Sequence, residues 1–161
     1  MPIPMSDPMP LRTTAAWPKF AKPEPLPHVY GRCSVPMVQF DQTRKVWLIA
    51  DHAIGGVDSV LRDRKDEKSY SFRNAVDSAG HPVALIELAS PLKSGESLSA
   101  TVRGKIDSDS GALIENPADV LRDVLALAGY AIPASAISAF RVECADIKLA
   151  GRLSDDLTVR G

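Results

Sequence analysis

Three histidines and one aspartate are the residues of this chain whose side chains most readily hold a metal ion or move a proton. The histidines are His28, His52 and His81, and Asp51 directly precedes His52. No two of the histidines have the spacing of metal ligands, so turn or surface positions are the simpler interpretation. We therefore expect no metal site and no acid–base catalysis from them.

Two cysteines, Cys33 and Cys144, are too few for a disulfide scaffold. Each has apolar neighbours along the chain, which favours buried thiols in a reducing compartment. One bridge between them is the alternative. Cys33 could form a nucleophile pair with a histidine, but no local pattern supports that arrangement.

The stretch 107–111 reads Asp-Ser-Asp-Ser-Gly and begins like a calcium-binding loop. Such a loop has glycine at its sixth position and glutamate at its twelfth, whereas this chain has Ala112 and Ala118 there. A tight turn between a strand and a helix explains these residues better. Phosphate-loop and G-x-S-x-G patterns are also missing. We therefore expect no catalytic or cofactor-binding residues, no cofactor and no enzymatic activity.

The composition is typical of a globular domain. Of 161 residues, 45% are hydrophobic and 24% are charged, and the net charge is -1. This charge disfavours a general nucleic-acid-binding surface, and we expect no direct recognition of a nucleic-acid sequence. The chain has no apolar run of about 18 residues, and its first residues show no signal-peptide pattern. We expect no membrane span and a cytoplasmic start.

Proline is the unusual component, since nine of the 13 prolines lie within the first 36 residues. This density favours extended chain over helix or interior strand and predicts an arm over residues 1–27, with a disordered tail as the alternative. Trp17 and Phe20 are large apolar side chains in a segment that builds no core of its own. We expect them to lie on another surface, of this chain or of a neighbour. With Tyr30 they are the candidates for a subunit interface.

Residues 29–106 have the pattern of an antiparallel β-domain. Apolar runs and alternation predict strands, and glycine pairs or charged stretches predict the turns between them. The charged run 62–68 is expected to be a solvent-exposed hairpin end, and Gly55-Gly56 to mark a turn or bulge. About five to seven short strands suggest an antiparallel sheet, sandwich or small barrel. The predicted strands include 35–40 around Pro36, 46–50, 70–74, 83–88 and 98–103.

The pair Asn116-Pro117 is the strongest local signal. Asn116 can accept the first free N–H groups of a helix as its N-cap, and Pro117 suits the first helical position. Asp119 favours the positive end of the helix dipole. The pattern predicts helices near 117–129 and 133–145 and a return to strand within 147–153.

These elements predict an α+β fold, an antiparallel β-barrel or sandwich followed by two helices. The arm occupies 1–27, and the β-rich domain with its helices occupies 28–153. The remaining stretch, 154–161, is a C-terminal tail or the start of a truncated helix.

Three stretches carry a family resemblance when they are taken in order. They are 26–31 with 35–37, 47–54 with 57–60, and 104–106 with 111–125. The most specific part is Ile-Glu-Asn-Pro-Ala-Asp-Val at 114–120, which leads from a β-domain into a helix. Together the stretches resemble bacteriophage tail-tip proteins, the hub or baseplate proteins of long-tailed phages and their prophage relatives.

The resemblance implies a structural virion component with a tail-tube-like fold, repeated around the tail axis in rings. It implies other phage tail proteins as partners and homo-oligomers, a trimer before a hexamer. The implied location is the tail tip or baseplate of the virion, after synthesis in the host bacterial cytoplasm. Hubs of this kind are longer than this chain, so a fragment, a split gene and a smaller ring subunit stay open.

Two other functions remain as alternatives. One is a small soluble enzyme or ligand-binding domain, which a pocket lined by Cys33, Asp51 and His52 would favour. The other is a tail assembly factor that is absent from the finished virion.

Overall fold

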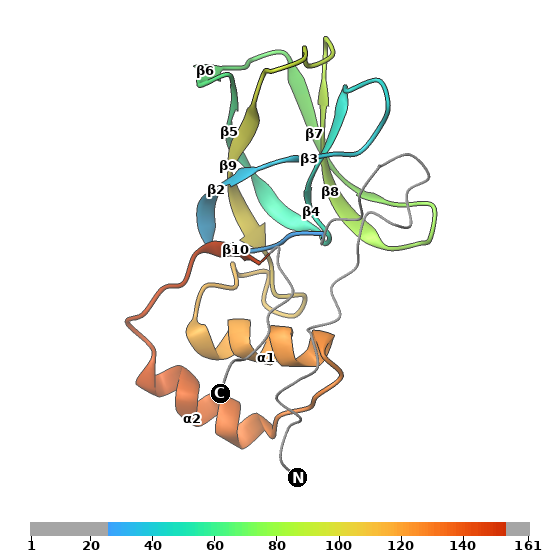
Figure 1. Ribbon diagram of the computed structural model, residues 1–161. Helices are drawn as coiled ribbons and strands as arrows, with labels where there is room; N and C mark the ends of the chain where they lie inside the picture. The colour runs from blue at the N-terminus through green and yellow to red at the C-terminus, as the bar shows by residue number, and fades with distance from the viewer. Residues whose placement is uncertain (1–25, 154–161) are drawn as a thin grey trace.

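The structure, a computed structural model, describes residues 26–153. Figure 1 shows a β-sandwich with two helices at one end. The described chain forms ten strands in antiparallel sheets and two helices, which confirms the α+β class. The sheets do not close into a barrel, so the sandwich is the architecture formed. Trp17, Phe20 and the stretch 154–161 lie outside the described residues, as does most of the predicted arm.

The first main sheet has one apolar and one polar face. In its strand β9, Leu98, Ala100 and Val102 are buried, and the residues between them point to the other face. This alternation confirms the half-buried strand expected at 98–103. The strand order is β2 (Arg32–Pro36), β9 (Leu98–Lys105), β5 (Ile54–Arg62) and β6 (Lys65–Asp66).

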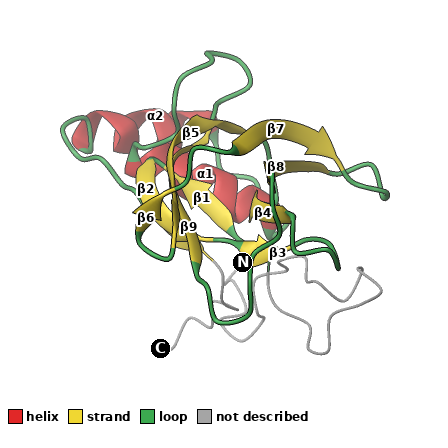
Figure 2. Ribbon diagram, turned by 90° about the horizontal axis from the view of Figure 1, so that it is seen from above, coloured by secondary structure: helices red, strands yellow, loops and turns green. Residues whose placement is uncertain are grey.

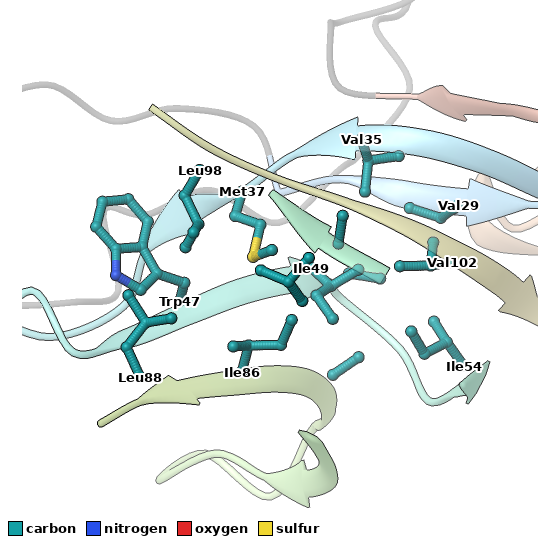
Figure 3. Close-up of a cluster of buried hydrophobic side chains, with 14 of the residues drawn as sticks. Val29, Val35, Met37, Trp47, Ile49, Ile54, Ile86, Leu88, Leu98 and Val102 are labelled. Atoms are coloured by element: carbon teal, nitrogen blue, oxygen red, sulfur yellow. The ribbon is translucent and has the colours of Figure 1, made fainter. Parts of the chain in front are cut away.

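The second main sheet packs its inner face against the first. Figure 3 shows Trp47 beside Leu88 and Leu98, and Ile49 and Ile86 in the same cluster as Val35 and Val102 of the opposite sheet. These side chains belong to one continuous apolar core, whose burial drives the two sheets together. The strand order is β3 (Val38–Gln39), β4 (Val46–Ala50), β8 (Pro82–Leu88) and β7 (Tyr70–Val76).

The stretch expected as one strand at 35–40 is divided between the two sheets. β2 ends at Pro36 and pairs with β9, whereas β3 begins at Val38 and pairs with β4. Proline has no N–H for a strand ladder, so it suits a strand end. Met37 between the two strands is buried in the core. The chain therefore crosses from one sheet to the other where the alternation is interrupted.

A side-chain amide joins the sheets at one corner. Asn74 of β7 donates from Nδ2 to the carbonyl oxygen of Ile54 in β5 and accepts the Ile54 N–H at Oδ1, both at 3.0 Å. Asn74 thus occupies the place that a neighbouring strand would take. The pair Gly55-Gly56 lies inside β5 and not in a turn, and the register of β5 shifts just beyond it, between Val57 and Ser59.

The charged run 62–68 forms the expected hairpin end. Asp63 and Arg64, at the tip between β5 and β6, both have left-handed backbone, with φ of 51° and 66°. Arg62 and Glu67 differ, because each side chain is only 16% exposed, and Arg62 contacts Glu96 at 2.6 Å. Arg62 also donates to the Pro91 carbonyl oxygen at 2.8 Å, so it holds the 90–96 loop against the sheet.

Two further strands and both helices complete the described chain. β1 (His28–Tyr30) pairs with β10 (Gly151–Leu153), so only the end of the stretch 147–153 is a strand. The helices are α1 (Pro117–Leu127) and α2 (Ala134–Glu143), close to the predicted 117–129 and 133–145. The views in Figure 1 and Figure 2 agree that they lie together at one end of the sandwich.

Two glycines allow the backbones to approach closely where the sandwich meets the helices. Gly104 of β9 donates its N–H to the Gly31 carbonyl oxygen at 2.8 Å, and Gly31 donates to Ile114 at 3.0 Å. A Cβ at Gly104 would lie 2.4 Å from the Val29 carbonyl oxygen. At Gly31, φ is +61° and a Cβ would lie 2.3 Å from the Leu149 carbonyl oxygen. A side chain at either position therefore forces the backbone apart.

We predict that Gly104→Ala lowers the free energy of unfolding by about 1–3 kcal/mol, because β1 must move to admit the methyl group. Gly151→Ala in β10 is the matched control, since a Cβ there meets no atom within 4 Å. It should change stability by no more than about 0.5 kcal/mol. Urea unfolding of the two variants measures the difference. Equal losses in the free energy of unfolding would show that the close approach of Gly104 to Val29 does not restrict side-chain size there.

Candidate functional site

The candidate site is the junction between the sandwich and the helices. β1, the loop after β4, the end of β9 and helix α1 meet there. Their polar side chains are far apart in the sequence and adjacent in the structure. We call them the junction cluster: His28, Tyr30, Asp51, His52, Lys105 and Asp123.

His52 is held by two backbone groups. Its Nε2 accepts the Val29 N–H at 2.9 Å, so Nδ1 carries the proton and donates to the Ala53 carbonyl oxygen at 2.8 Å. The side chain closes the end of β4 against β1. Both ring nitrogens are occupied, and the imidazole serves as a connector between backbone segments.

Burial keeps the His52 ring neutral at pH 7. Desolvation lowers its pKa to about 4, and the nearby His28 and Lys105 add to the shift. The hydrogen bond to Ala53 and the charge of Asp123 oppose the shift without cancelling it. A ring with this pKa and with both nitrogens bonded is poorly suited to general acid–base work near neutral pH.

Tyr30, Asp123 and Lys105 tie β1 and β9 to α1. The Tyr30 hydroxyl donates to Asp123 Oδ2 at 2.5 Å, and Lys105 Nζ lies 2.6 Å from Oδ1 of the same carboxylate. Burial, with the hydrogen bond to Asp123 second, raises the pKa of Tyr30 far above its ordinary value. The phenol therefore stays protonated and acts as a donor.

The structure corrects the expectation for two of the three histidines. His28 and His52 were expected in turns or on the surface, yet they are 4% and 5% exposed and their ring centroids lie 5.2 Å apart. His28 Nε2 also lies 4.0 Å from Asp51 Oδ2. His81, in the turn before β8, is exposed as expected. Within residues 26–153, no three His, Cys, Asp or Glu side chains are grouped so as to hold a metal ion.

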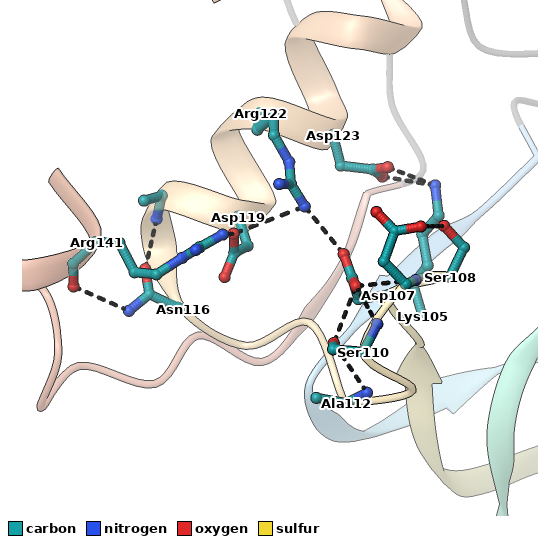
Figure 4. A network of polar contacts seen from close by, with 12 residues as sticks. Lys105, Asp107, Ser108, Ser110, Ala112, Asn116, Asp119, Arg122, Asp123 and Arg141 are labelled. Carbon is teal, nitrogen blue, oxygen red and sulfur yellow. Dashed lines mark hydrogen bonds and ion pairs between the residues drawn. The ribbon is translucent and has the colours of Figure 1, made fainter. Parts of the chain in front are cut away.

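The stretch 107–111 is a turn closed by its own aspartate, as Figure 4 shows. Asp107 Oδ1 accepts the Ser110 N–H at 2.8 Å and the Ser110 hydroxyl at 2.9 Å, and Oδ2 contacts Arg122 of α1 at 3.1 Å. These hydrogen bonds, those from Ser110 first, lower the pKa of Asp107 to about 2. One carboxylate oxygen closes the turn and the other binds α1, which confirms the tight turn expected there.

Asn116 is the N-cap of α1, and Pro117 begins the helix, as the sequence predicts. The Asn116 Oδ1 accepts the Ala118 N–H at 2.9 Å, and Nδ2 donates to the Cys144 carbonyl oxygen of α2 at 3.2 Å. One amide therefore satisfies the start of one helix and the end of the other. Asp119 and Arg141 form a further link between α1 and α2 (Figure 4).

The remaining candidate residues are separated from one another. Tyr30, a candidate for a subunit interface, is 2% exposed and lies inside the subunit, where α1 covers it. Trp17 and Phe20 lie outside the described residues. Cys33 is partly buried and Cys144 is buried, and both are free thiols, so the alternative of a bridge between them is wrong. Burial raises the pKa of Cys33.

Most of the exposed large apolar side chains of residues 26–153 lie on the helices or in the segments next to them. Val142 of α2 is 77% exposed and Leu121 of α1 is 41% exposed. Neither side chain was predicted from the sequence to be exposed. The others in this part of the chain are Ile106, Tyr130, Ile147 and Leu149.

Two hollows open on the surface of the sandwich, away from the junction cluster. One, of about 340 Å³, lies between β5 and β7 and is lined by Asp58, Glu67 and Tyr70 among others. The second, of about 440 Å³, lies beside β7 and β8 and includes Ser71 and Glu87. The pocket of Cys33, Asp51 and His52 that would favour an enzyme is neither of these two.

Comparison of the chain with protein-family models, with curated proteins and with solved structures finds no match. Among the described residues, neither helix has the length and apolar character needed to cross a membrane.

We predict that burial of His52 makes the domain less stable in acid. The unfolded ring has a pKa near 6.5 and the folded ring near 4. Protons therefore bind the unfolded state preferentially between these values, and stability is complete above about pH 6.5 and falls as the pH drops toward 4. The loss is about 3 kcal/mol at most.

His52→Gln is the control for this pH dependence. It cannot titrate, so its free energy of unfolding should vary less between pH 6.5 and pH 4 than that of the wild type. Urea unfolding at several pH values measures both proteins. Parallel curves for the two proteins would remove His52 as the cause.

Proposed function

We propose that this chain is a structural subunit of a bacteriophage tail tip or baseplate, a hub or hub-adjacent protein that assembles as a ring. The observation that carries the proposal is the meeting of the three resembling stretches at the junction. Asp51 donates its N–H to the Pro27 carbonyl oxygen at 2.8 Å, which joins the second stretch to the first. Tyr30 donates to Asp123 at 2.5 Å, which joins the first to the third.

The three stretches that resemble tail-tip proteins therefore form one connected unit in space. Chance resemblance in three separate stretches would not require them to contact one another. Gly31 and Gly104, which permit the closest backbone approach, both belong to these stretches. This supports a shared arrangement of sandwich, junction and helix over a coincidence of short motifs.

The surface around the helices supports assembly. Exposed apolar side chains are favoured at contacts between proteins, because association removes them from water. Val142 and Leu121 stand on the two helices, and Ile147 and Leu149 lie on the segment that follows α2. We assign this helical surface to contacts with other copies or with other tail proteins.

Open sheet edges also suit a ring. β2 ends the first sheet and β3 ends the second, so each sheet has a strand with one unpaired side among the described residues. Such edges accept strands or loops from a neighbouring subunit. Closed rings repeat one heterologous contact around an axis, so the helical surface of one copy would meet a different surface of the next.

The proposal is tested on the particle and on the purified protein. Mass spectrometry of purified virions should find the chain, and light scattering of the purified protein should give a trimer, with a hexamer as the second possibility. Absence from virions contradicts the proposal. If the chain is then abundant in infected cells, the assembly-factor alternative is favoured.

Val142→Asp should weaken assembly, because it places a charge on the helical surface. Val76→Asp is the matched control, since Val76 on β7 is also an exposed valine, at 67% against 77% for Val142. We expect Val142→Asp to shift the mass measured by light scattering toward the monomer, and Val76→Asp to leave it unchanged. Both variants should keep the wild-type unfolding transition. Equal effects on mass would contradict the assignment of the helical surface.

A further inference from the structure

We propose that residues 1–25 bind the outer face of the sheet β3-β4-β8-β7 in their own subunit, with Trp17 and Phe20 as the apolar anchors. The proposal is independent of the phage assignment, because it concerns how the subunit covers one of its own sheets. It rests on the apolar outer face of this sheet and on Leu26, with which the described chain begins on that face.

The second main sheet is apolar on both faces. In β4 the residues from Trp47 to Ala50 are all buried, and in β8 those from Val83 to Ile86 are all buried. In β9 of the first sheet, buried and less buried residues alternate. An antiparallel sheet with solvent on one side shows the alternating pattern, whereas continuous burial is typical of strands covered on both sides.

The outer face carries a row of apolar side chains across the strands. Val38 pairs with Leu48, and Leu48 pairs with Leu85, so the three stand side by side on β3, β4 and β8. Leu48 is 0% exposed and Leu85 is 3% exposed. The row ends at β7, where Arg73 stands opposite Leu85 and pairs with Glu87 at 3.4 Å. The polar rim on β7 and β8 marks the limit of the apolar face.

The first described residue already lies on this face. Leu26 is 1% exposed and belongs to the same apolar cluster as Val38, Leu48, Val83 and Leu85. The Pro27 carbonyl oxygen accepts the Asp51 N–H at 2.8 Å, which fixes the chain where it reaches the sheet. One leucine side chain cannot cover a row of side chains that crosses three strands, so other residues must cover most of the outer face.

The preceding residues have the reach to supply that cover. Phe20 lies six residues before Leu26 and Trp17 nine, which allows extended spans of up to about 20 Å and 30 Å. Four strands are only about 14 Å wide from first to last. The aromatic anchors can therefore reach every part of the face without leaving their own subunit.

The composition of the segment suits a flat apolar face. Pro18, Pro23 and Pro25 favour extended chain, which loses less conformational entropy when it binds than a flexible chain does. Phe40, Val46 and Ala75 are partly buried apolar side chains packed against the cluster, and they enlarge the surface that the anchors can contact. Trp17 and Phe20 thus become anchors within the subunit, where the sequence also allowed contacts with a neighbour.

Tryptophan fluorescence tests the position of Trp17. The chain has two tryptophans, so Trp47→Phe leaves Trp17 as the only emitter. In this variant we expect blue-shifted emission and acrylamide quenching several-fold weaker than in a free peptide of residues 1–25. Quenching equal to that of the peptide overturns the proposal.

A charge on the outer face should release the segment. Leu85→Lys in the Trp47→Phe background should raise acrylamide quenching of Trp17 toward the peptide value. Thr101→Lys is the matched control, because Thr101 alternates with the buried residues of β9 and faces outward from the other sheet. An equal rise in both variants overturns the assignment of the face.

Photo-crosslinking keeps the proposal falsifiable if these variants fold poorly. The photoreactive residue p-benzoylphenylalanine replaces Phe20 in the otherwise wild-type chain, and isotopically heavy and light copies are mixed before irradiation. We expect crosslinks to peptides from β3, β4 or β8, joining heavy to heavy and light to light. Heavy-to-light crosslinks would assign the segment to a second copy, and crosslinks to other elements would remove it from this face. Either result overturns the proposal.

Discussion

The closeness of β1 to the end of β9 is the constraint on which the rest of the junction depends. Gly104 donates to the Gly31 carbonyl oxygen at 2.8 Å, and a Cβ at Gly104 would fall 2.4 Å from the Val29 carbonyl oxygen. Only because the backbones approach this far can His52 accept the Val29 N–H and Tyr30 reach Asp123 on α1. The position of the helices is thus set by backbone contact and then secured by side chains.

The same closeness explains why the residues with the richest chemistry are used for structure. The junction buries several polar groups, and a buried polar group that lacked a partner would lower stability. Both ring nitrogens of His52 form hydrogen bonds with backbone groups, and both carboxylate oxygens of Asp123 bind Tyr30 or Lys105. Asp107 and Asn116 do the same in the segments that lead into α1. Here the histidine joins β1 to the end of β4, and the carboxylates hold the sandwich to α1.

What the sequence could predict depends on how local each signal is. The cap at Asn116, the turn at Asp107 and the hairpin at 62–68 are decided within a few residues, and all three are confirmed. The contact of His52 with Val29 spans 23 residues, and the amide link of Asn74 to Ile54 spans 20. Such links depend on how the sheets pack against each other. The hydrophobic periodicity of the sequence does not give this packing, so the junction cluster could not be predicted.

The two main sheets divide the surface of the subunit between two tasks. The outer face of the first sheet is polar, whereas that of β4 and β8 is apolar, and we propose that the proline-rich segment before Leu26 covers it. If that segment lies on its own sheet, most of the exposed large apolar side chains of residues 26–153 that remain for neighbours are on or next to the helices, Val142 foremost. The helical region of the chain would then serve assembly, and the residues before Leu26 would serve the fold of the subunit. A ring built this way would join the helical surface of one subunit to a different surface of the next, and the proline-rich segment would serve the stability of each subunit.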